Sequence, residues 1–447
     1  MFKKFIILVL LAPITIFFLI LSFNTPKTAS AVLQEPGLIE LSLLTKIACK
    51  PSSQIVAELI RTFQNGQILD AVAPLKSNGP TKASYLIKLE TGAALKLIQI
   101  FFRGLLRRSI IEYHESFLQS STRPKLMAIA SNTCKIIEGR RLSYNKQGTL
   151  DKLAILDPSL QQTSYEVSLN PPIPFNNDPG GIEVALIDTG VNYTLPSINS
   201  NLGRDVEGKL LGFDYWDMDN RPFDADFSRS LFFPFHHGTS VASILIREAP
   251  IARIIPYRFP RHFMHRMGQL VADLDKSNAR IVNLAMGSNK REDWLEFETA
   301  ARARPHILFI VSAGNDNRDL DIEPVYPAAL HLQNLLVVTS SNNFGQLAKG
   351  SNWGRNTVHI MVPGEHIPVI DHRGTMSKAS GSSFSVPRVA ALAARLIAKN
   401  QTWGAKELKD AILSKAIRSP YQSDLPLSHG WIADPTDDFL PKSSTIK

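Results

Sequence analysis

Three residues that could together form an activated hydroxyl lie far apart in the chain. Ser383 stands in "SGSSFSVPRV", at the mouth of a predicted helix whose apolar residues fall on one face. His237 stands just before the run "GTSVASILI", and Asp188 directly follows the apolar run "IEVALI". A serine, a histidine and a carboxylate supply a nucleophile, a base and a group that orients the base. The order Asp, His, Ser is one of the known orders for such a triad.

Each of these residues also has another interpretation. Serines at a helix start accept hydrogen bonds from the first backbone N–H groups, and a lone histidine is most often structural. The "DTG" that begins at Asp188 also occurs in aspartic proteases, which need two carboxylates that share a proton. The chain has no second Asp-Thr-Gly or Asp-Ser-Gly, so that interpretation would require a dimer.

The elements expected around these residues are those of a sheet covered on both faces by helices. Residues 182–187, 280–286 and 307–313 are continuous apolar runs, which are typical of parallel strands buried on both faces. Sites in such sheets form at the carboxyl ends of the strands. We therefore expect an α/β protein with a three-layer fold and a mostly parallel central sheet, with its site just beyond these runs.

Shorter amphipathic segments precede this sheet. Residues 52–63 predict a helix, residues 85–89 a strand and residues 93–106 a second helix. The stretch 170–181 is rich in Pro, Asn and Gly and predicts a linker. The sequence therefore predicts a smaller α+β region in front of the main domain.

The first 31 residues predict export. Lys3 and Lys4 precede an apolar stretch at residues 5–21, and the small residues of "TASA" end at Ala31. We expect a signal peptide cleaved after Ala31 and a secreted or periplasmic protein. The alternative is an uncleaved segment that anchors the chain in the membrane, with its bulk outside the cytoplasm. The net charge of +9 comes without a basic stripe interleaved with aromatic residues, so we expect no nucleic-acid partner.

Candidates for disulfide and metal chemistry are few. Cys49 and Cys134 could pair in an oxidising compartment, and no His/Cys cluster has zinc spacing. The acidic stretch 217–228 resembles a calcium loop, but Pro222 stands where that loop needs Gly and Ser228 where it needs Glu. We interpret this stretch as a solvated acidic loop. We expect that no cofactor is required and identify no metal ligands. The sequence is compatible with a structural calcium ion but does not identify a site for it.

Four sequence blocks resemble, in order, those of the subtilases, the subtilisin-like serine proteases. The blocks are "ALIDTGV", "HGTSVAS", "VSAGND" and "SGSSFSVPRVAAL". The resemblance implies a subtilisin-like peptidase domain over residues 181–435, followed by a C-terminal tail, 436–447. It implies that Asp188, His237 and Ser383 are the triad of a serine endopeptidase, which would hydrolyse proteins or peptides through an acyl-enzyme intermediate.

The same resemblance implies how a developing oxyanion would be bound. Asn315 in "VSAGND" would donate from its side-chain amide, and the backbone N–H of Ser383 would donate from the helix start. Ser382 occupies the family's usual Thr position and keeps a hydroxyl that could assist. Phe384 replaces the usual Met after the nucleophile.

"NLAMGS" resembles the family's edge strand, which pairs with the substrate backbone. The substrate-binding residues implied by it and by the third block are Ala285, Met286, Gly287 and Gly314. The usual Ser and Leu of the edge strand are replaced by Ala285 and Met286. We expect these departures to affect substrate preference more than the mechanism.

The front region has two interpretations. Residues 153–168 resemble the end of an inhibitory prosegment, with a helix, a turn and an exiting strand. Residues 32–165 are therefore expected to be either a prosegment that inhibits its own enzyme or an accessory domain, joined to the main domain by a linker at 166–180. The alternative to an enzyme is a catalytically silent subtilase-fold protein that binds peptides, but every triad residue type and Asn315 are present.

Overall fold

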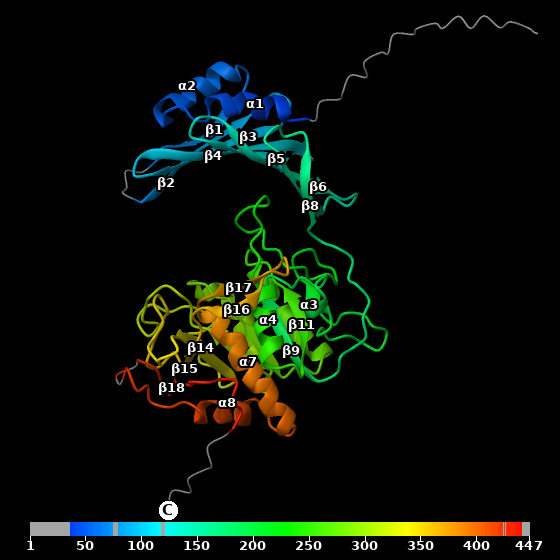
Figure 1. Ribbon diagram of the computed structural model, residues 1–447, viewed down its shortest axis with the longest axis vertical. Helices are drawn as coiled ribbons and strands as arrows, with labels where there is room; N and C mark the ends of the chain where they lie inside the picture. Colours follow the sequence, from blue (N-terminus) through cyan, green and yellow to red (C-terminus); the bar gives the residue numbers. More distant parts are fainter. Residues whose placement is uncertain (1–35, 75–78, 118–120, 423, 425, 440–447) are drawn as a thin grey trace, which may run out of the picture.

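The computed structural model describes residues 36–74, 79–117, 121–422, 424 and 426–439. They form two units that are stacked along the longest axis of the molecule (Figure 1). The predicted signal peptide, 1–31, lies outside the described residues and stays a prediction. Within the described residues, the structure contains no helix with the length and apolar character needed to cross a membrane.

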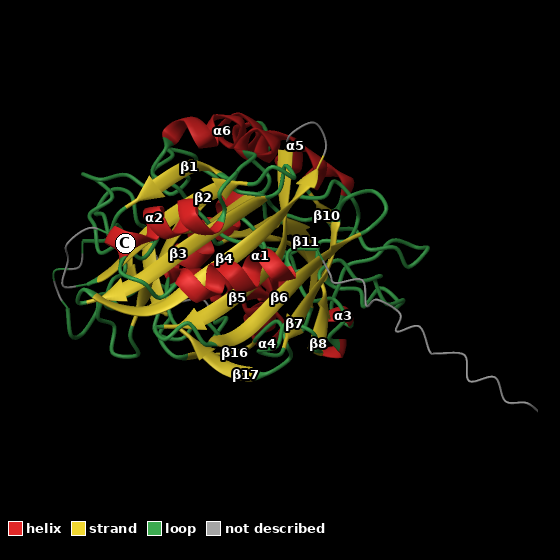
Figure 2. Ribbon diagram, turned by 90° about the horizontal axis from the view of Figure 1, so that it is seen from above, coloured by secondary structure: helices red, strands yellow, loops and turns green. Residues whose placement is uncertain are grey.

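An antiparallel meander of eight strands, in the order β1 to β8, builds the N-terminal unit. The strands are β1 (Gln67–Val72), β2 (Pro80–Lys88), β3 (Ala94–Phe102), β4 (Leu105–Phe117), β5 (Ser121–Ser131), β6 (Ile136–Tyr144), β7 (Leu150–Leu156) and β8 (Thr163–Ser168). Helices α1 (Leu38–Ile47) and α2 (Ser52–Thr62) lie across one face of this sheet, and Figure 2 looks down onto them. Leu41, Leu44 and Leu59 are fully or almost fully buried there. A disulfide between Cys49 and Cys134 joins the α1–α2 connection to the β5–β6 turn.

Two helices predicted in this unit are wrong. Residues 93–106 form β3 and the start of β4, with a turn at residues 103–104 whose φ angles are positive. Leu95 and Leu97, two positions apart, face the helices, so the apolar pattern is that of a strand. Residues 153–168 lie in β7, a turn and β8 instead of a helix and a strand. A short apolar run fits both periods, and pairing with neighbouring strands decides between them.

Eight parallel strands form the central sheet of the C-terminal unit, in the order β10-β11-β9-β12-β13-β14-β15-β18. They are β9 (Ile182–Asp188), β10 (Phe213–Asp214), β11 (Ala252–Arg258), β12 (Ile281–Leu284), β13 (Leu308–Ser312), β14 (Leu335–Ser341), β15 (Ile360–Pro363) and β18 (Gly430–Trp431). A separate antiparallel pair is formed by β16 (Ile367–Ile370) and β17 (Met376–Ala379).

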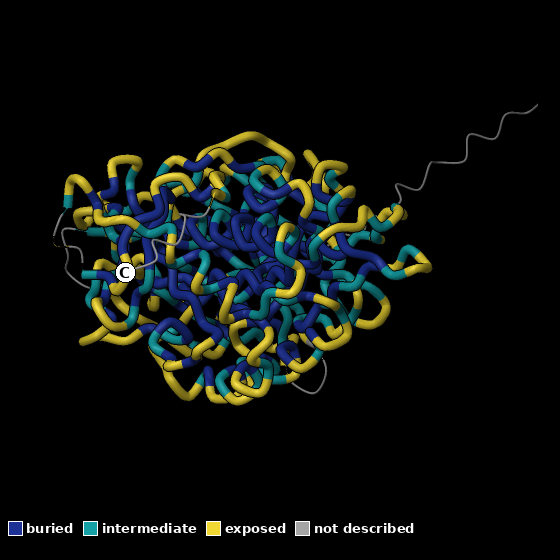
Figure 3. Tube along the Cα trace, turned by 90° about the horizontal axis from the view of Figure 1, so that it is seen from below, coloured by how far each residue is buried: buried dark blue, intermediate teal, exposed yellow. Residues whose placement is uncertain are grey.

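Helices cover both faces of this sheet. One face packs against α4 (Gly238–Glu248), α7 (Ser382–Lys399) and α8 (Ala405–Ser414), the other against α5 (Met267–Asp273) and α6 (Leu295–Arg302). The remaining short helices are α3 (Pro196–Asn199), η1 (Met264–Arg266), η2 (Leu274–Lys276) and η3 (Arg291–Trp294). The strands and the inner helix faces form the buried interior, drawn dark blue in Figure 3. This confirms the three-layer α/β fold with a mostly parallel sheet, preceded by a smaller α+β region.

The linker runs along the outside of the C-terminal unit (Figure 1). Because β8 ends at Ser168, the linker begins three residues later than the expected 166. The Tyr193 hydroxyl donates to the carbonyl of Pro171 at 2.7 Å, and Arg204 donates to the carbonyl of Pro174 at 3.1 Å. These contacts hold the linker against the C-terminal unit between the end of β8 and the start of β9.

One loop of the C-terminal unit, residues 216–235, reaches the other face of the N-terminal sheet (Figure 1); we call it the docking loop. Its apolar residues Phe227 and Phe232 share a buried cluster with residues of β5, β6 and β7. Arg140 of β6 donates to the carbonyl of Phe232 at 2.8 Å, and its guanidinium lies 4.1 Å from the ring centroid of Phe233. The two units are therefore joined by apolar and polar contacts in addition to the linker.

Candidate active site

The structure brings the three residues of the predicted triad to one edge of the parallel sheet. Asp188 is the last residue of β9, and β9 is a central strand. His237 immediately precedes α4, and Ser383 is the second residue of α7. These two helices pack against each other on the same face of the sheet. The site lies beyond the carboxyl ends of the strands, where such sites form.

Asp188 and His237 form a closed pair. The Nδ1 atom of His237 lies 2.8 Å from Oδ1 and 2.9 Å from Oδ2 of Asp188. Asp188 is only 2 % exposed, and its Oδ1 also accepts a hydrogen bond from the backbone N–H of Thr189 at 2.7 Å. A carboxylate at Nδ1 fixes the ring orientation and the tautomer that carries its proton on Nδ1. The other ring nitrogen, Nε2, is then the basic one.

Close backbone packing and two aromatic rings set the position of His237. A Cβ atom on Gly238 would lie 2.0 Å from the carbonyl oxygen of Gly190, so α4 approaches β9 through a residue without a side chain. The Phe235 ring stacks on His237 at 5.8 Å between centroids, and the Phe384 ring lies at 5.4 Å. Phe384, which replaces the family's usual Met, thus forms one wall around the histidine.

The pKa of His237 is raised by its surroundings. Burial of the ring acts to lower this pKa, but the charge of Asp188 and its hydrogen bond raise it, and Asp224 raises it further. Arg261 acts in the opposite direction. The two carboxylates outweigh burial, so the site favours the imidazolium that forms when His237 accepts a proton.

Ser383 is partly exposed at the start of α7. Within the described residues no hydrogen bond joins it to His237, and its backbone N–H has no acceptor. Such hydrogen bonds are often long in enzymes without substrate and tighten when substrate binds. The free N–H is one of those that a helix start leaves without a partner, at the positive end of the helix dipole.

Asn315 follows β13 and is held by its side-chain oxygen. Its Oδ1 accepts from the backbone N–H of Ser382 at 2.8 Å and from the Ser382 hydroxyl at 3.0 Å. The Nδ2 group of this exposed residue therefore remains able to donate to a ligand. Ser382 is fully buried, and its Oγ also lies 2.7 Å from Oγ of Ser312. The Ser382 hydroxyl thus orients Asn315 and is itself engaged inside the protein.

The expected substrate-binding residues follow β12, where its pairing with both neighbouring strands ends at Leu284. Ala285 is 4 % and Met286 5 % exposed, so the Met286 side chain lies in the hydrophobic core. Gly287 is exposed, and Gly314 has a φ of 97°, in the region that favours glycine. The main chain of residues 285–287 is therefore the part that could pair with an extended peptide.

Sequence reasoning missed Asp224 and wrongly described its surroundings as solvated. Asp224 is 1 % exposed and accepts from the hydroxyl of Thr189, the backbone N–H of His237 and both the N–H and the hydroxyl of Thr239. Asp226 is 5 % exposed. Nearby donors satisfy these carboxylates, so their burial is possible. The aromatic residues of the docking loop pack on the N-terminal sheet and keep the loop away from solvent. The alternation in "FDADF" indicates that the apolar residues of this segment are buried, but it gives no signal that Asp224 is buried too.

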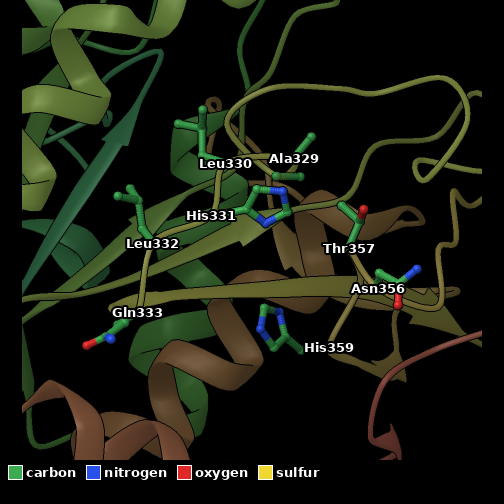
Figure 4. A pocket seen from close by; sticks show the side chains of 9 residues that line it. Ala329, Leu330, His331, Leu332, Gln333, Asn356, Thr357 and His359 are labelled. Carbon is green, nitrogen blue, oxygen red and sulfur yellow. The ribbon is translucent and has the colours of Figure 1, made fainter.

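Two cavities lie apart from the group formed by Asp188, His237, Ser383 and Asn315. The pocket in Figure 4 has a volume of about 270 Å³ and is lined by residues 328–333, 356, 357 and 359. The pKa of its His359 is lowered to about 3, first by burial, and its Nδ1 accepts from the Val337 N–H. A larger cavity of about 650 Å³ lies between the two units, beside His236 and His372. Among the described residues, no group of three His, Cys, Asp or Glu side chains could hold a metal ion.

Comparison with known proteins assigns the chain to a family. The subtilase family matches residues 180–439. The thermophilic serine proteinase of Bacillus sp. (strain AK1) is 28 % identical over 236 residues, which are 49 % of this chain and 53 % of that protein. Thermitase of Thermoactinomyces vulgaris is 24 % identical over 251 residues, or 53 % of this chain and 81 % of thermitase. A solved cold adapted subtilisin-like serine proteinase is 22 % identical and covers 58 % of this chain and 90 % of its own, with a TM-score of 0.47.

The fold and the family match define a protein of the subtilisin-like serine protease class. The chain belongs to the subtilase family, whose model covers more than half of it. The chain spans about half the length of the Bacillus proteinase and 19 % of subtilisin-like protease 2 of Plasmodium falciparum.

Proposed function

We propose that this protein is an exported serine endopeptidase that uses Asp188, His237 and Ser383. The observation that supports this most is the pair formed by Asp188 and His237, with both carboxylate oxygens within 2.9 Å of Nδ1. That pair leaves Nε2 of a neutral ring as a base, next to the helix start that carries Ser383. A buried Asp–His pair beside a serine at a helix start is the arrangement that activates a hydroxyl.

The acylation step follows from these positions. Ser383 Oγ attacks the carbonyl carbon of a peptide bond and its proton moves to Nε2 of His237. A C–O bond forms, and the carbonyl electron pair moves onto the oxygen, which becomes an oxyanion. The Ser383 N–H and Asn315 Nδ2 donate hydrogen bonds to that oxygen.

Collapse of this intermediate breaks the C–N bond. The imidazolium of His237 gives its proton to the leaving amine, which departs with a free amino terminus. Water then attacks the acyl-enzyme with His237 again acting as the base, and the carboxylic acid is released as Ser383 regains its proton. The raised pKa of His237 favours the imidazolium in both halves of the reaction.

The substrate would be an extended segment of a protein or peptide. Residues 285–287 leave the ladder of β12 and offer backbone groups for pairing, and the curated relatives are named as proteases. Export is the second part of the proposal and rests on the sequence of residues 1–31. Its test is the N-terminus of the protein recovered outside the cytoplasm, which should be Val32. A chain that still carries residues 1–31 would support the membrane-anchored alternative.

A fluorophosphonate label tests the catalytic part directly, because it reacts only with an activated serine. The wild-type protein recovered outside the cytoplasm should be labelled on Ser383, and Ser383→Ala should not be labelled at all. A folded wild-type protein that binds peptides but does not take the label would be the catalytically silent alternative.

A further inference from the structure

We propose that Asp224 is a positioning residue for His237, and that the N-terminal unit remains in the active protein because it holds the docking loop that carries Asp224. The inference rests on the proposed function and goes beyond it. It assigns a role to a carboxylate outside the triad, and it assigns residues 36–168 to a retained accessory domain.

The contacts of Asp224 connect three parts of the site. Its Oδ1 lies 2.5 Å from the Thr189 hydroxyl, next to Asp188, and 3.1 Å from the backbone N of His237. Its Oδ2 lies 3.0 Å from the backbone N of Thr239 and 2.5 Å from the Thr239 hydroxyl, in the first turn of α4. One carboxylate therefore binds the end of β9, the main chain of the histidine and the helix that follows it.

The chemistry of these contacts calls for a carboxylate. All four partners donate, and a carboxylate offers two oxygens that can accept from them. An amide at this position would turn an NH₂ group toward one pair of donors. The negative charge also lies at the start of α4, where the helix dipole stabilises it.

Part of the docking loop depends on the N-terminal unit for its apolar contacts, whereas Phe223 packs in the core of the C-terminal unit. Phe232 is 1 % and Phe227 is 8 % exposed, and both belong to the cluster that includes Met127 and Leu142 of the N-terminal sheet. Without that sheet these aromatic rings would be exposed to water, which is unfavourable in proportion to the apolar area uncovered. We expect the part of the loop around Phe227 and Phe232 then to rearrange and to displace Asp224, although Phe223 stays in the core of the C-terminal unit.

The path of the chain agrees with a retained domain. A prosegment that inhibits by occupying the cleft as a cleavage product would place its last strand on residues 285–287. Among the described strands, β8 pairs with β7 alone. Among the described residues, no hydrogen bond or salt bridge links residues 36–181 to Asn315, Ser383 or residues 285–287. The N-terminal unit supports the histidine side of the site and leaves the serine side accessible.

Asp224→Asn tests the first step, with Asp226→Asn as the matched control. Asp226 lies in the same loop and is also buried, and among the described residues its side chain accepts only from the backbone N–H of Ser228. We expect Asp224→Asn to lower kcat roughly 10- to 100-fold with little change in KM, because a displaced base impairs the chemical step. The control should retain both constants. A folded Asp224→Asn protein with wild-type kcat would overturn the proposal.

The pH profile separates positioning from general stability. The charged groups that act on His237 are Asp188 from β9, Asp224 from the docking loop and Arg261 after β11. His236 is the residue before His237 in the chain. The rings of Phe235 and Phe384, which contact His237, carry no charge. Asp224 raises the pKa of His237, and the reaction needs the neutral ring. Removal of that charge should therefore move the acidic limb of kcat/KM to lower pH, whereas an unshifted limb would contradict a direct effect on the histidine.

Thr189 offers a second pair of variants in case Asp224→Asn does not fold. The Thr189 hydroxyl donates to Asp224 and accepts from the backbone N–H groups of His237 and Gly238. Thr189→Ser keeps the hydroxyl and should retain kcat, and Thr189→Val removes it and should lower kcat several-fold. Equal kcat values for the two variants would overturn the role of this network.

Phe232→Ser tests the second step, with Phe232→Leu and Phe344→Ser as controls. Phe344 is 62 % exposed in the C-terminal unit. Phe344→Ser therefore makes the same Phe-to-Ser substitution away from the docking loop. We expect Phe232→Ser to lower both kcat and the rate of fluorophosphonate labelling, and both controls to keep them. The labelled wild-type species should contain residues 36–168. An active species that begins after Ser168 would overturn the retained domain.

The experiments distinguish a failure of the proposed function from a failure of this inference. A wild-type protein that takes no fluorophosphonate would contradict the proposed function, whatever the variants do. A labelled wild-type protein whose Asp224→Asn and Phe232→Ser variants match it would contradict only this inference.

Discussion

At the scale of single residues, the site depends on which atom of a side chain makes a hydrogen bond inside the protein and which atom remains available for a ligand or a proton. Asn315 uses its oxygen to accept from Ser382, and this leaves the amide nitrogen available to a ligand. His237 uses Nδ1 on Asp188, and this leaves Nε2 as the nitrogen that we propose accepts the Ser383 proton. In both cases a contact inside the protein determines the chemistry of the opposite end of the side chain.

Asn315→Leu should therefore reduce the chemical step and leave binding largely intact. The substitution removes one preorganised donor to the oxyanion, so kcat should fall about 10²- to 10³-fold with little change in KM. Steady-state kinetics on a peptide substrate measure both constants. Asn201→Leu, which removes an amide whose bonds are local to the α3 turn, is the control. A change confined to KM would assign Asn315 to substrate binding instead.

The identity of the proposed triad could be predicted from sequence because each member follows a recognisable local pattern. Asp188 ends an apolar run, and Ser383 opens an amphipathic helix. Asp224 has no such pattern, since its role depends on burial and on donors from Thr189 and Thr239, which only the folded chain brings together. An acidic stretch looks the same in sequence whether water or protein donors satisfy it.

At the scale of elements, α4 and the loop that follows β9 approach so closely that only glycine fits between them. The atom that a Gly238 side chain would meet is a backbone oxygen of Gly190, which cannot move aside alone. The apolar strands β9, β12 and β13 were predictable because burial on both faces leaves a continuous apolar run. β3 and β4 were not, because their apolar residues also fit a helical period and only pairing with β2 and β5 excludes a helix.

Gly238→Ala should disturb both stability and catalysis. The added Cβ would lie 2.0 Å from the Gly190 oxygen, so α4 must shift away from β9 and carry His237 with it. We expect a loss of about 1–3 kcal/mol in the free energy of unfolding, typical of overpacking, together with a lower kcat. Gly404→Ala is the control, because its Cβ would meet only the end of the flexible Glu407 side chain at 3.0 Å. Equal melting temperatures and kcat values for the two variants would refute the argument.

At the scale of the whole molecule, a disulfide lies in one unit and the proposed triad in the other. Cys49 and Cys134 are 85 residues apart and fix the helical layer of the N-terminal unit onto its sheet. Nearby, Gln99 and Ser109 donate to the carbonyl of Ala48, so polar contacts also hold this connection. In the chain-entropy model, closing a loop of this length stabilises the folded unit by roughly 4–5 kcal/mol.

A retained N-terminal unit makes the activity sensitive to that disulfide. The double variant Cys49→Ser/Cys134→Ser should lose activity at a lower temperature than the wild type, because unfolding of the N-terminal sheet exposes Phe232 and releases the docking loop. Residual activity after heating, measured with and without a thiol reductant, checks this. Reductant should lower the inactivation temperature of the wild type and leave that of the double variant unchanged. If the active enzyme is indifferent to reductant and lacks both cysteines, the N-terminal unit has been removed as a prosegment, and the support it would give to His237 is not required for catalysis.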